Sequence, residues 1–175
     1  MNALHSVSPE VLVATGGSVS LRAADLTSVV QRATQSPRRR ARLCAHPDPT
    51  DPLHEMLICL ARGTYVRPHR HRGKSESFHL IAGELDVVLF EDDGTIRATI
   101  RLGPYSSNQV FFYRLMEPCY HTVLVASESA VFHETTNGPF DPQTTELAPW
   151  APAEGDEQAA EYLDQLCSRI QRGLP

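Results

Sequence analysis

The chain predicts an all-β fold, a sandwich or barrel of short strands, with a short helix before it and a longer helix after it. Between about residues 40 and 135, short apolar runs alternate with glycine, proline and aspartate. Such punctuation at close spacing is typical of strands joined by tight turns. On either side of this region, apolar residues recur at the three- and four-residue spacing of an amphipathic helix.

Length and composition indicate one globular domain. The 175 residues, of which 41% are hydrophobic and 21% charged, suffice for a single core. No apolar run has the length of a membrane span, and the first residues lack the pattern of a signal peptide. The four cysteines lie far apart and form no Cys-x-x-Cys pair, so we expect reduced thiols in a cytoplasmic protein.

Residues 1–35 are expected to form an arm followed by a short helix. Residues 1–20 show no clear period, which favours a loosely packed arm. Asp25 is the expected N-cap of the helix, and Ser36-Pro37 is expected to end it. One face of this helix is apolar, with Leu26, Val29, Val30 and Ala33.

The barrel is expected over residues 36–140. The segment 92–95 reads Asp-Asp-Gly-Thr and predicts a hairpin turn, because Asp-Gly supplies the positive φ that such turns need. The expected strands lie at about residues 57–60, 77–81, 85–90, 96–102, 110–115, 120–125 and 130–134.

Residues 141–175 are expected to pack on the barrel within the same domain. The segment 138–152 contains four prolines and predicts an ordered but irregular crossing, pinned to the barrel by Trp150. A helix is expected over residues 157–172, with Gly173 as its stop. Its apolar face consists of Ala159, Leu163, Leu166 and Ile170.

One segment of the expected barrel carries metal-binding chemistry. Residues 63–83 contain two histidines one residue apart and a glutamate five residues later. Because side chains alternate faces along a strand, His69 and His71 point the same way, and a turn at Gly73 lets Glu76 lie beside them. Imidazole and carboxylate together suit Zn, Fe, Mn, Ni or Cu. We therefore predict a site for one divalent transition metal.

The spacing Gly-x5-His-x-His-x4-Glu-x6-Gly resembles the first motif of the cupin superfamily. The resemblance implies a double-stranded β-helix, or jelly-roll barrel, and a fourth metal ligand several strands downstream. His121 is the best candidate for that ligand. The second cupin motif is altered here, since Met116 stands at its usual proline and Pro118 at its usual glycine.

Longer stretches resemble the WbuC family of cupin-fold metalloproteins, over roughly residues 26–165. They are residues 36–46, 76–79, 113–121, 133–140 and 148–154. That family is associated with bacterial O-antigen and polysaccharide gene clusters. The resemblance therefore implies a carbohydrate or sugar-nucleotide substrate, but it implies no particular reaction.

Other polar side chains are candidates for roles in the barrel interior. Glu134 is the candidate general acid or base, and the alternative is that it partners a buried arginine such as Arg114. Three tyrosines are candidates for lining the cavity mouth, although aromatic rings in barrel strands are more often core residues. They are Tyr65, Tyr113 and Tyr120.

Two residues next to the motifs are expected to lie outside the metal site. His79 has the opposite strand parity to Glu76, which favours a packing role. Cys119 lies two residues before His121, so its thiol either approaches the metal or, as we expect, is buried and inert.

Positive charge is concentrated in two segments, although the net charge is −5. Residues 38–42 carry four arginines, and residues 62–74 carry four arginines and one lysine. These are either solvated basic faces or an anion-attracting rim. Arg67 has the parity of His69 and His71, so we expect it to face inward and help to bind an anionic ligand at the metal. A nucleic-acid binder would be basic overall, so no nucleic-acid partner is expected.

The leading interpretation is a metal-dependent enzyme acting on a small anionic or carbohydrate-type substrate, similar to an isomerase or epimerase. The alternatives are a metal-dependent dioxygenase and a non-catalytic cupin that binds a small ligand. We also expect a homodimer, because open strand edges and the N-terminal arm offer surfaces for pairing.

Overall fold

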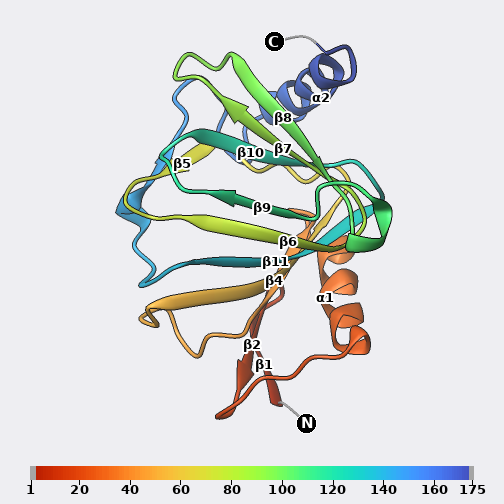
Figure 1. The fold of residues 1–175 in the computed structure, drawn as a ribbon, viewed down its shortest axis with the longest axis vertical. Helices are drawn as coiled ribbons and strands as arrows, with labels where there is room; N and C mark the ends of the chain where they lie inside the picture. Colours follow the sequence, from red (N-terminus) through yellow and green to blue (C-terminus); the bar gives the residue numbers. More distant parts are fainter. Residues whose placement is uncertain (1–2, 174–175) are drawn as a thin grey trace.

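Eight strands between Leu53 and Asn137 are divided between two facing sheets in the computed structural model, which describes residues 3–173 (Figure 1). The first sheet contains β4 (Leu53–Ala61), β6 (Glu76–Ala82), β9 (Phe112–Leu115) and β11 (Ser129–Asn137). The second contains β5 (His69–His71), β7 (Leu85–Phe90), β8 (Ile96–Leu102) and β10 (Tyr120–Val125).

The strand order of these two sheets is that of a jelly roll. The first sheet has the order β4-β11-β6-β9 and the second β5-β10-β7-β8. Counting the eight strands along the chain, these orders are 1-8-3-6 and 2-7-4-5, and all of these pairings are antiparallel. The structure thereby confirms the predicted fold class.

Three N-terminal strands extend the first sheet beyond β4. They are β3 (Arg40–Cys44), β2 (Val11–Thr15) and β1 (Ala3–Ser8). The expectation of a loosely packed arm is therefore wrong for residues 3–15, while Met1 and Asn2 lie outside the described residues. Leu12 and Ala14 are buried at alternate positions of β2, but Val11 and Val13 between them are also apolar, which hides the period of two in the sequence.

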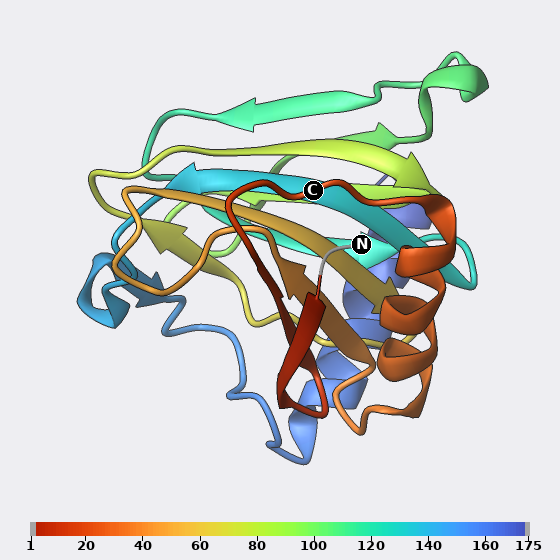
Figure 2. The ribbon, with the colours of Figure 1, turned by 90° about the horizontal axis from the view of Figure 1, so that it is seen from below.

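The two α-helices of the described chain cover the outer faces of opposite sheets (Figures 1 and 2). Helix α1 (Ala23–Gln35) packs over β3 and β4, and α2 (Gln158–Gln171) packs on the second sheet. Arg22, not Asp25, is the N-cap of α1, and the Asp25 carboxylate accepts a hydrogen bond of 2.6 Å from the Arg22 N–H. Neither helix is long and apolar enough to cross a membrane.

The segment between β11 and α2 contains regular structure that the sequence does not predict. It includes a short 3-10 helix, η2 (Pro142–Thr144), and strand β12 (Thr145–Leu147), which pairs with β5. Trp150 pins the segment to the barrel as expected, because its ring packs against Phe90 at 5.0 Å and its Nε1 donates to the Asp92 carbonyl at 3.1 Å.

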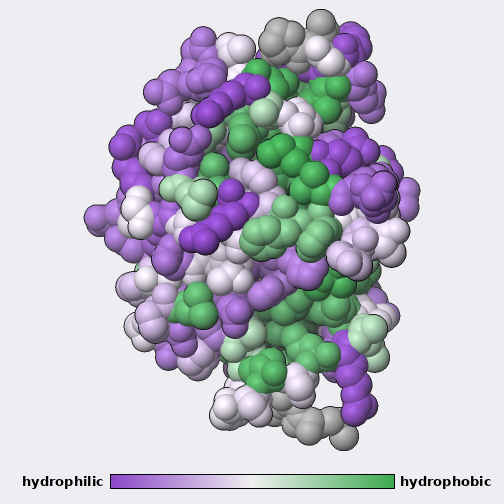
Figure 3. Space-filling model, viewed as in Figure 1, coloured by the Kyte–Doolittle hydropathy of each residue, from purple (hydrophilic) through white to green (hydrophobic). Residues whose placement is uncertain are grey.

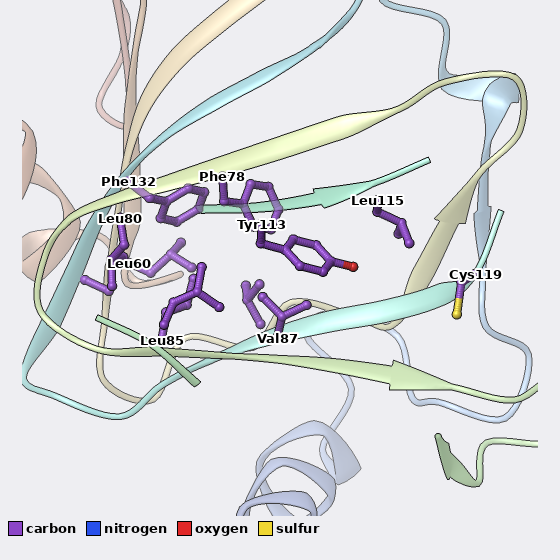
Figure 4. Packing of buried hydrophobic residues seen from close by; sticks show 12 residues of the cluster. Leu60, Phe78, Leu80, Leu85, Val87, Tyr113, Leu115, Cys119 and Phe132 are labelled. Atoms are coloured by element: carbon purple, nitrogen blue, oxygen red, sulfur yellow. The ribbon is translucent and has the colours of Figure 1, made fainter. Parts of the chain in front are cut away.

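An apolar core fills the space between the two sheets (Figure 4). Two of its most deeply buried members are Leu80, toward the end of β6, and Leu85, at the start of β7. Phe78 and Phe132 extend the core toward the middle of the barrel, and their ring centroids lie 5.0 Å apart. Glu76 begins β6 at the other end of this strand, so the core leaves that end free for polar groups.

Apolar side chains are exposed on the outer face of the first sheet, beside the region that α1 covers (Figure 3). They lie on β6, on β9 and in the segment before β9, which contains the 3-10 helix η1 (Tyr105–Ser107). They are Ile81, Tyr105, Val110, Phe111 and Phe112. His79 meets Phe111 here at 5.6 Å, so it lies outside the barrel as its parity predicts. The expected homodimer stays a prediction.

Candidate metal centre

Three histidines converge between the two sheets. His69 and His121 stand directly opposite each other on β5 and β10, and His71 lies two residues along β5 on the same face. One ring nitrogen of each lies within 4.8 Å of the others, a spacing that suits ligands of one metal ion. His121 is almost completely buried, while His69 and His71 are half-buried, so the group extends from the barrel interior toward its opening.

The other ring nitrogen of each histidine is already engaged. Nδ1 of His69 lies 2.9 Å from the Arg67 carbonyl, and Nδ1 of His121 lies 3.0 Å from the Cys119 carbonyl. Nδ1 of His71 lies 3.1 Å from Oγ1 of Thr145 on β12. Because a carbonyl only accepts, Nδ1 of His69 and His121 must carry the proton, which leaves their Nε2 lone pairs free for a metal.

Glu76 joins the histidines from the first sheet. Its Oε1 lies 2.6 Å from Nε2 of His121, and its Oε2 lies 3.5 Å from Nε2 of His71. Although Oε1 is buried and very close to Nε2, it has no partner with hydrogen-bond geometry. This arrangement fits two ligands that face a common cation.

The electrostatics of the cluster favour the metal-binding protonation state at Glu76 and His69, whereas at His121 the Glu76 carboxylate outweighs burial and raises the pKa of the imidazole, so a metal there must displace a proton. Burial alone would raise the pKa of Glu76, but the charge of His121 and contacts with both histidines hold that pKa well below its usual range. Burial, with the nearby charge of His121, lowers the pKa of His69 to about 4. Glu76 is thus an anion and His69 is neutral near pH 7, as metal coordination requires.

The histidines line a cavity of about 780 Å³, which lies within the usual size range of small-molecule sites. One wall is the inner face of the first sheet, including Ile58, Phe132 and Glu134. The cavity continues past β4 to the arginines of the β3 region, and it is bounded there by the β1–β2 turn and the segment around Leu147. It is therefore much larger than a metal ion needs.

Glu134 faces this cavity from β11. It stands opposite Phe78, and therefore diagonally from Glu76 on the same face of the sheet. Burial, and then the charge of Glu76, raise the pKa of Glu134 to about 8. Arg114 is not its partner, because this arginine is exposed on the outer face and donates to Ser75 Oγ at 3.4 Å. The cations that act on Glu134 are Arg42 and, more weakly, His121.

Replacing Glu134 by glutamine is expected to stabilise the metal-free protein more at pH 8 than at pH 5. A buried acid whose folded pKa is raised loses stability as pH rises from its unfolded value, near 4.5, to its folded value of about 8. Glutamine cannot ionise, so this loss disappears in the variant. Thermal melts of chelator-treated wild type and variant at both pH values check the prediction, and an equal shift in melting temperature at both would contradict it.

The structure places Arg67 in the cavity wall, in keeping with its parity. Its guanidinium donates to the Ala148 carbonyl at 2.7 Å, while its buried Nε–H has no acceptor. No carboxylate of residues 3–173 lies within ion-pair distance of it. Arg70 and Arg72 instead lie on the outer side of β5 and bind Glu146. Glu146 therefore neutralises positive charge that the sequence suggested for an anion-attracting rim.

The three candidate tyrosines do not line the cavity, which corrects the expectation. The Tyr65 hydroxyl donates to the Pro152 carbonyl at 2.8 Å, and its ring meets Tyr162 of α2. The Tyr120 hydroxyl donates to Glu146 at 2.7 Å on the outer face of the second sheet. Tyr113 lies in the apolar core, against Phe78. Tyr120 directly precedes His121, so strand parity alone already directs its side chain away from the metal.

Cys119 is a buried thiol that does not belong to the histidine cluster. Its Sγ lies 3.5 Å from the carbonyls of Phe90 and Tyr120, and its own carbonyl accepts from His121. The four cysteines are all free. Sequence reasoning missed Thr145, which contacts the His71 ring, because it reaches the site only through the pairing of β12 with β5.

Fold and site together define the class of protein: a jelly-roll barrel of the cupin type whose interior holds a histidine group that can bind a metal ion. A family model described as a domain of unknown function (DUF6016) matches residues 21–102. No curated protein sequence matches the chain.

Three solved structures illustrate what the chain is similar to. A protein of Shewanella oneidensis is 15% identical with a TM-score of 0.49, over 75% of this chain and 80% of that one. A mutant oxalate decarboxylase of Bacillus subtilis is 17% identical (TM-score 0.47), over 62% of this chain and 27% of that one. The DMSP lyase of Ruegeria pomeroyi is 18% identical (TM-score 0.48), over 65% and 54%. The fold assignment itself rests on the strand order.

Proposed function

We propose that the protein binds one divalent transition metal through His69, His71, Glu76 and His121 and acts as a metal-dependent enzyme on a small anionic or carbohydrate-type substrate. One observation carries the metal part. One ring nitrogen each of His69, His71 and His121 lies within 4.8 Å of the others, and the buried Glu76 carboxylate lies 2.6 Å from Nε2 of His121. A cation among these groups would be coordinated by all four.

Such a metal would supply Lewis-acid chemistry, with open positions for a substrate oxygen, because four protein ligands do not fill the shell of most transition metals. The chain itself supplies the other groups. Glu134, in the same cavity and with its pKa raised toward neutrality, exchanges a proton with the substrate. Arg67 orients an anionic group with a guanidinium N–H that has no acceptor within the protein.

The substrate class follows from the resemblance to the WbuC family, and we propose that the chain is a member with a role in polysaccharide metabolism. An isomerase or epimerase needs a base beside the substrate, and Glu134 supplies this feature. A dioxygenase is the second candidate. Element analysis of the purified protein tests this alternative, because iron or copper would favour oxygen chemistry, whereas zinc, manganese or nickel is compatible with isomerisation and with ligand binding. A purely ligand-binding cupin would not need Glu134 as an acid or base.

The anionic part of the proposal is tested by thermal shift with metal-loaded protein. Sugar phosphates and sugar acids are expected to raise the melting temperature more than neutral sugars, because a ligand that binds only the folded state stabilises it. The Arg67→Ala variant is expected to lose most of this ligand-induced shift. Arg62→Ala is the matched control, since Arg62 is an exposed arginine outside the cavity lining.

Two results would count against the anionic part. One is stabilisation by neutral sugars but not by their anionic analogues. The other is an unchanged ligand-induced shift in Arg67→Ala. Each variant is compared with its own ligand-free melting temperature, because loss of the Arg67 bond to Ala148 lowers stability by itself.

A further inference from the structure

Arginines of the β3 region line the cavity that holds the histidines. Ala41 and Leu43 of β3 pack outward, against α1. The alternation of side chains along the strand therefore sends Arg40 and Arg42 to the inner face, where they line the cavity wall together with Arg38. Three of the four arginines of this basic segment therefore line the open side of the cavity, where Arg38 and Arg42 are also exposed to solvent.

Two of these three arginines have carboxylate partners, and the third has none. Arg38 lies 3.5 Å from Glu10 in the β1–β2 turn, and Arg40 is paired with Glu154 in the segment before α2. Within residues 3–173, no carboxylate lies within ion-pair distance of Arg42. The Nε–H of Arg40 is also buried without an acceptor. This wall therefore presents more guanidinium donors than the protein has acceptors for.

The three arginines lie in the same cavity as the metal centre, but at some distance from it. Three strand spacings separate β3 from β6, where Glu76 lies, and this corresponds to about 14 Å along the sheet. Glu134 lies between them on β11, facing the same cavity. A ligand held at the arginines therefore has to extend past Glu134 to reach the histidines.

We propose that the arginines of the β3 region form a second subsite, which binds a phosphate or carboxylate group of the ligand, with Arg42 as its principal contact. Guanidinium groups bind both anions through paired N–H donors, and an arginine with no carboxylate at ion-pair distance can form such bonds without first breaking an ion pair. The ligand is accordingly elongated, with an anionic group at one end and a metal-binding group at the other. This subsite adds to the proposed function and rests on it only for the metal-binding end of the ligand.

The test uses chelator-treated protein and two probes, inorganic phosphate and acetate, at constant ionic strength. The melting temperature of the wild type is expected to rise with probe concentration, because the probe binds only the folded state. The probe concentration needed for a given rise in melting temperature is expected to increase about tenfold in Arg42→Gln and to stay unchanged in Arg62→Gln. The probe with the larger shift shows which anion the subsite prefers. Constant ionic strength excludes general screening as the cause.

Three results would overturn the subsite. They are equal shifts in the wild type and Arg42→Gln, no shift in the wild type, and a shift that exists only when metal is bound. The His71→Ala variant separates this inference from the proposed function. It is expected to keep the phosphate-induced shift although its metal site is disrupted, so failure of the metal proposal leaves the anion result intact. If the protein binds metal normally but Arg42→Gln leaves the phosphate-induced shift unchanged, the subsite is wrong and the metal proposal stands.

Discussion

The His71→Ala variant is expected to lose at least about tenfold in metal affinity, while its barrel stays folded. His71 contributes one of three ring nitrogens that lie within 4.8 Å of one another, so its removal leaves an incomplete ligand shell. The fold does not depend on the metal as a zinc finger does, because an apolar core fills the other end of the barrel.

Metal content after equilibration with a limiting supply of metal, together with a thermal melt, measures both parts of this prediction. The matched control is His79→Ala, which removes an exposed histidine of β6 that contacts Phe111. This control is expected to keep full occupancy. Full occupancy in His71→Ala would contradict the ligand set, and loss of its cooperative transition would show that the metal is structural.

The Gly83→Ala variant is expected to be destabilised by about 3 kcal/mol or more, and Gly73→Ala by only about 1 kcal/mol. Both glycines have positive φ, +80° and +70°, so both substitutions incur the same backbone strain. They differ in the space around them. A Cβ at Gly83 would lie 2.0 Å from the Ser129 carbonyl oxygen, whereas a Cβ at Gly73 would meet nothing within 4 Å.

Denaturant unfolding of the two variants and the wild type gives the comparison directly. Gly83 lies between β6 and β7, against the start of β11, so a side chain there forces backbone segments apart. Equal losses in free energy of unfolding would show that the segments separate easily and that positive φ is the only constraint. The expected difference also explains why the histidine motif ends in a glycine, Gly83. The turn at Gly83 positions the end of β6, and Glu76 begins this strand.

Local patterns were sufficient to predict most of the barrel. The predicted ranges 85–90, 96–102 and 120–125 coincide with β7, β8 and β10, because turn residues delimit each of them clearly. Strand β12 could not be predicted in this way. It is three residues long and exists through its pairing with β5, which is a tertiary contact that the sequence does not encode locally.

The sequence predicted the site less evenly than the fold. The parity of His69 and His71 and the turn before Glu76 are local features, so their convergence could be predicted. The role of β3 could not. Its alternation of arginine with Ala41 and Leu43 normally directs apolar residues to the barrel interior and arginine to solvent. Helix α1 covers the outer face and takes the apolar residues, so the arginines face the cavity.

The most direct test of the metal centre is a crystal structure of the metal-loaded protein, with anomalous scattering recorded at the absorption edge of the bound element. We expect one strong peak per chain, within about 2.0–2.3 Å of Nε2 of His69, His71 and His121 and of a Glu76 oxygen. A peak elsewhere, or no peak after loading with zinc, manganese, iron, nickel and copper in turn, would contradict the account.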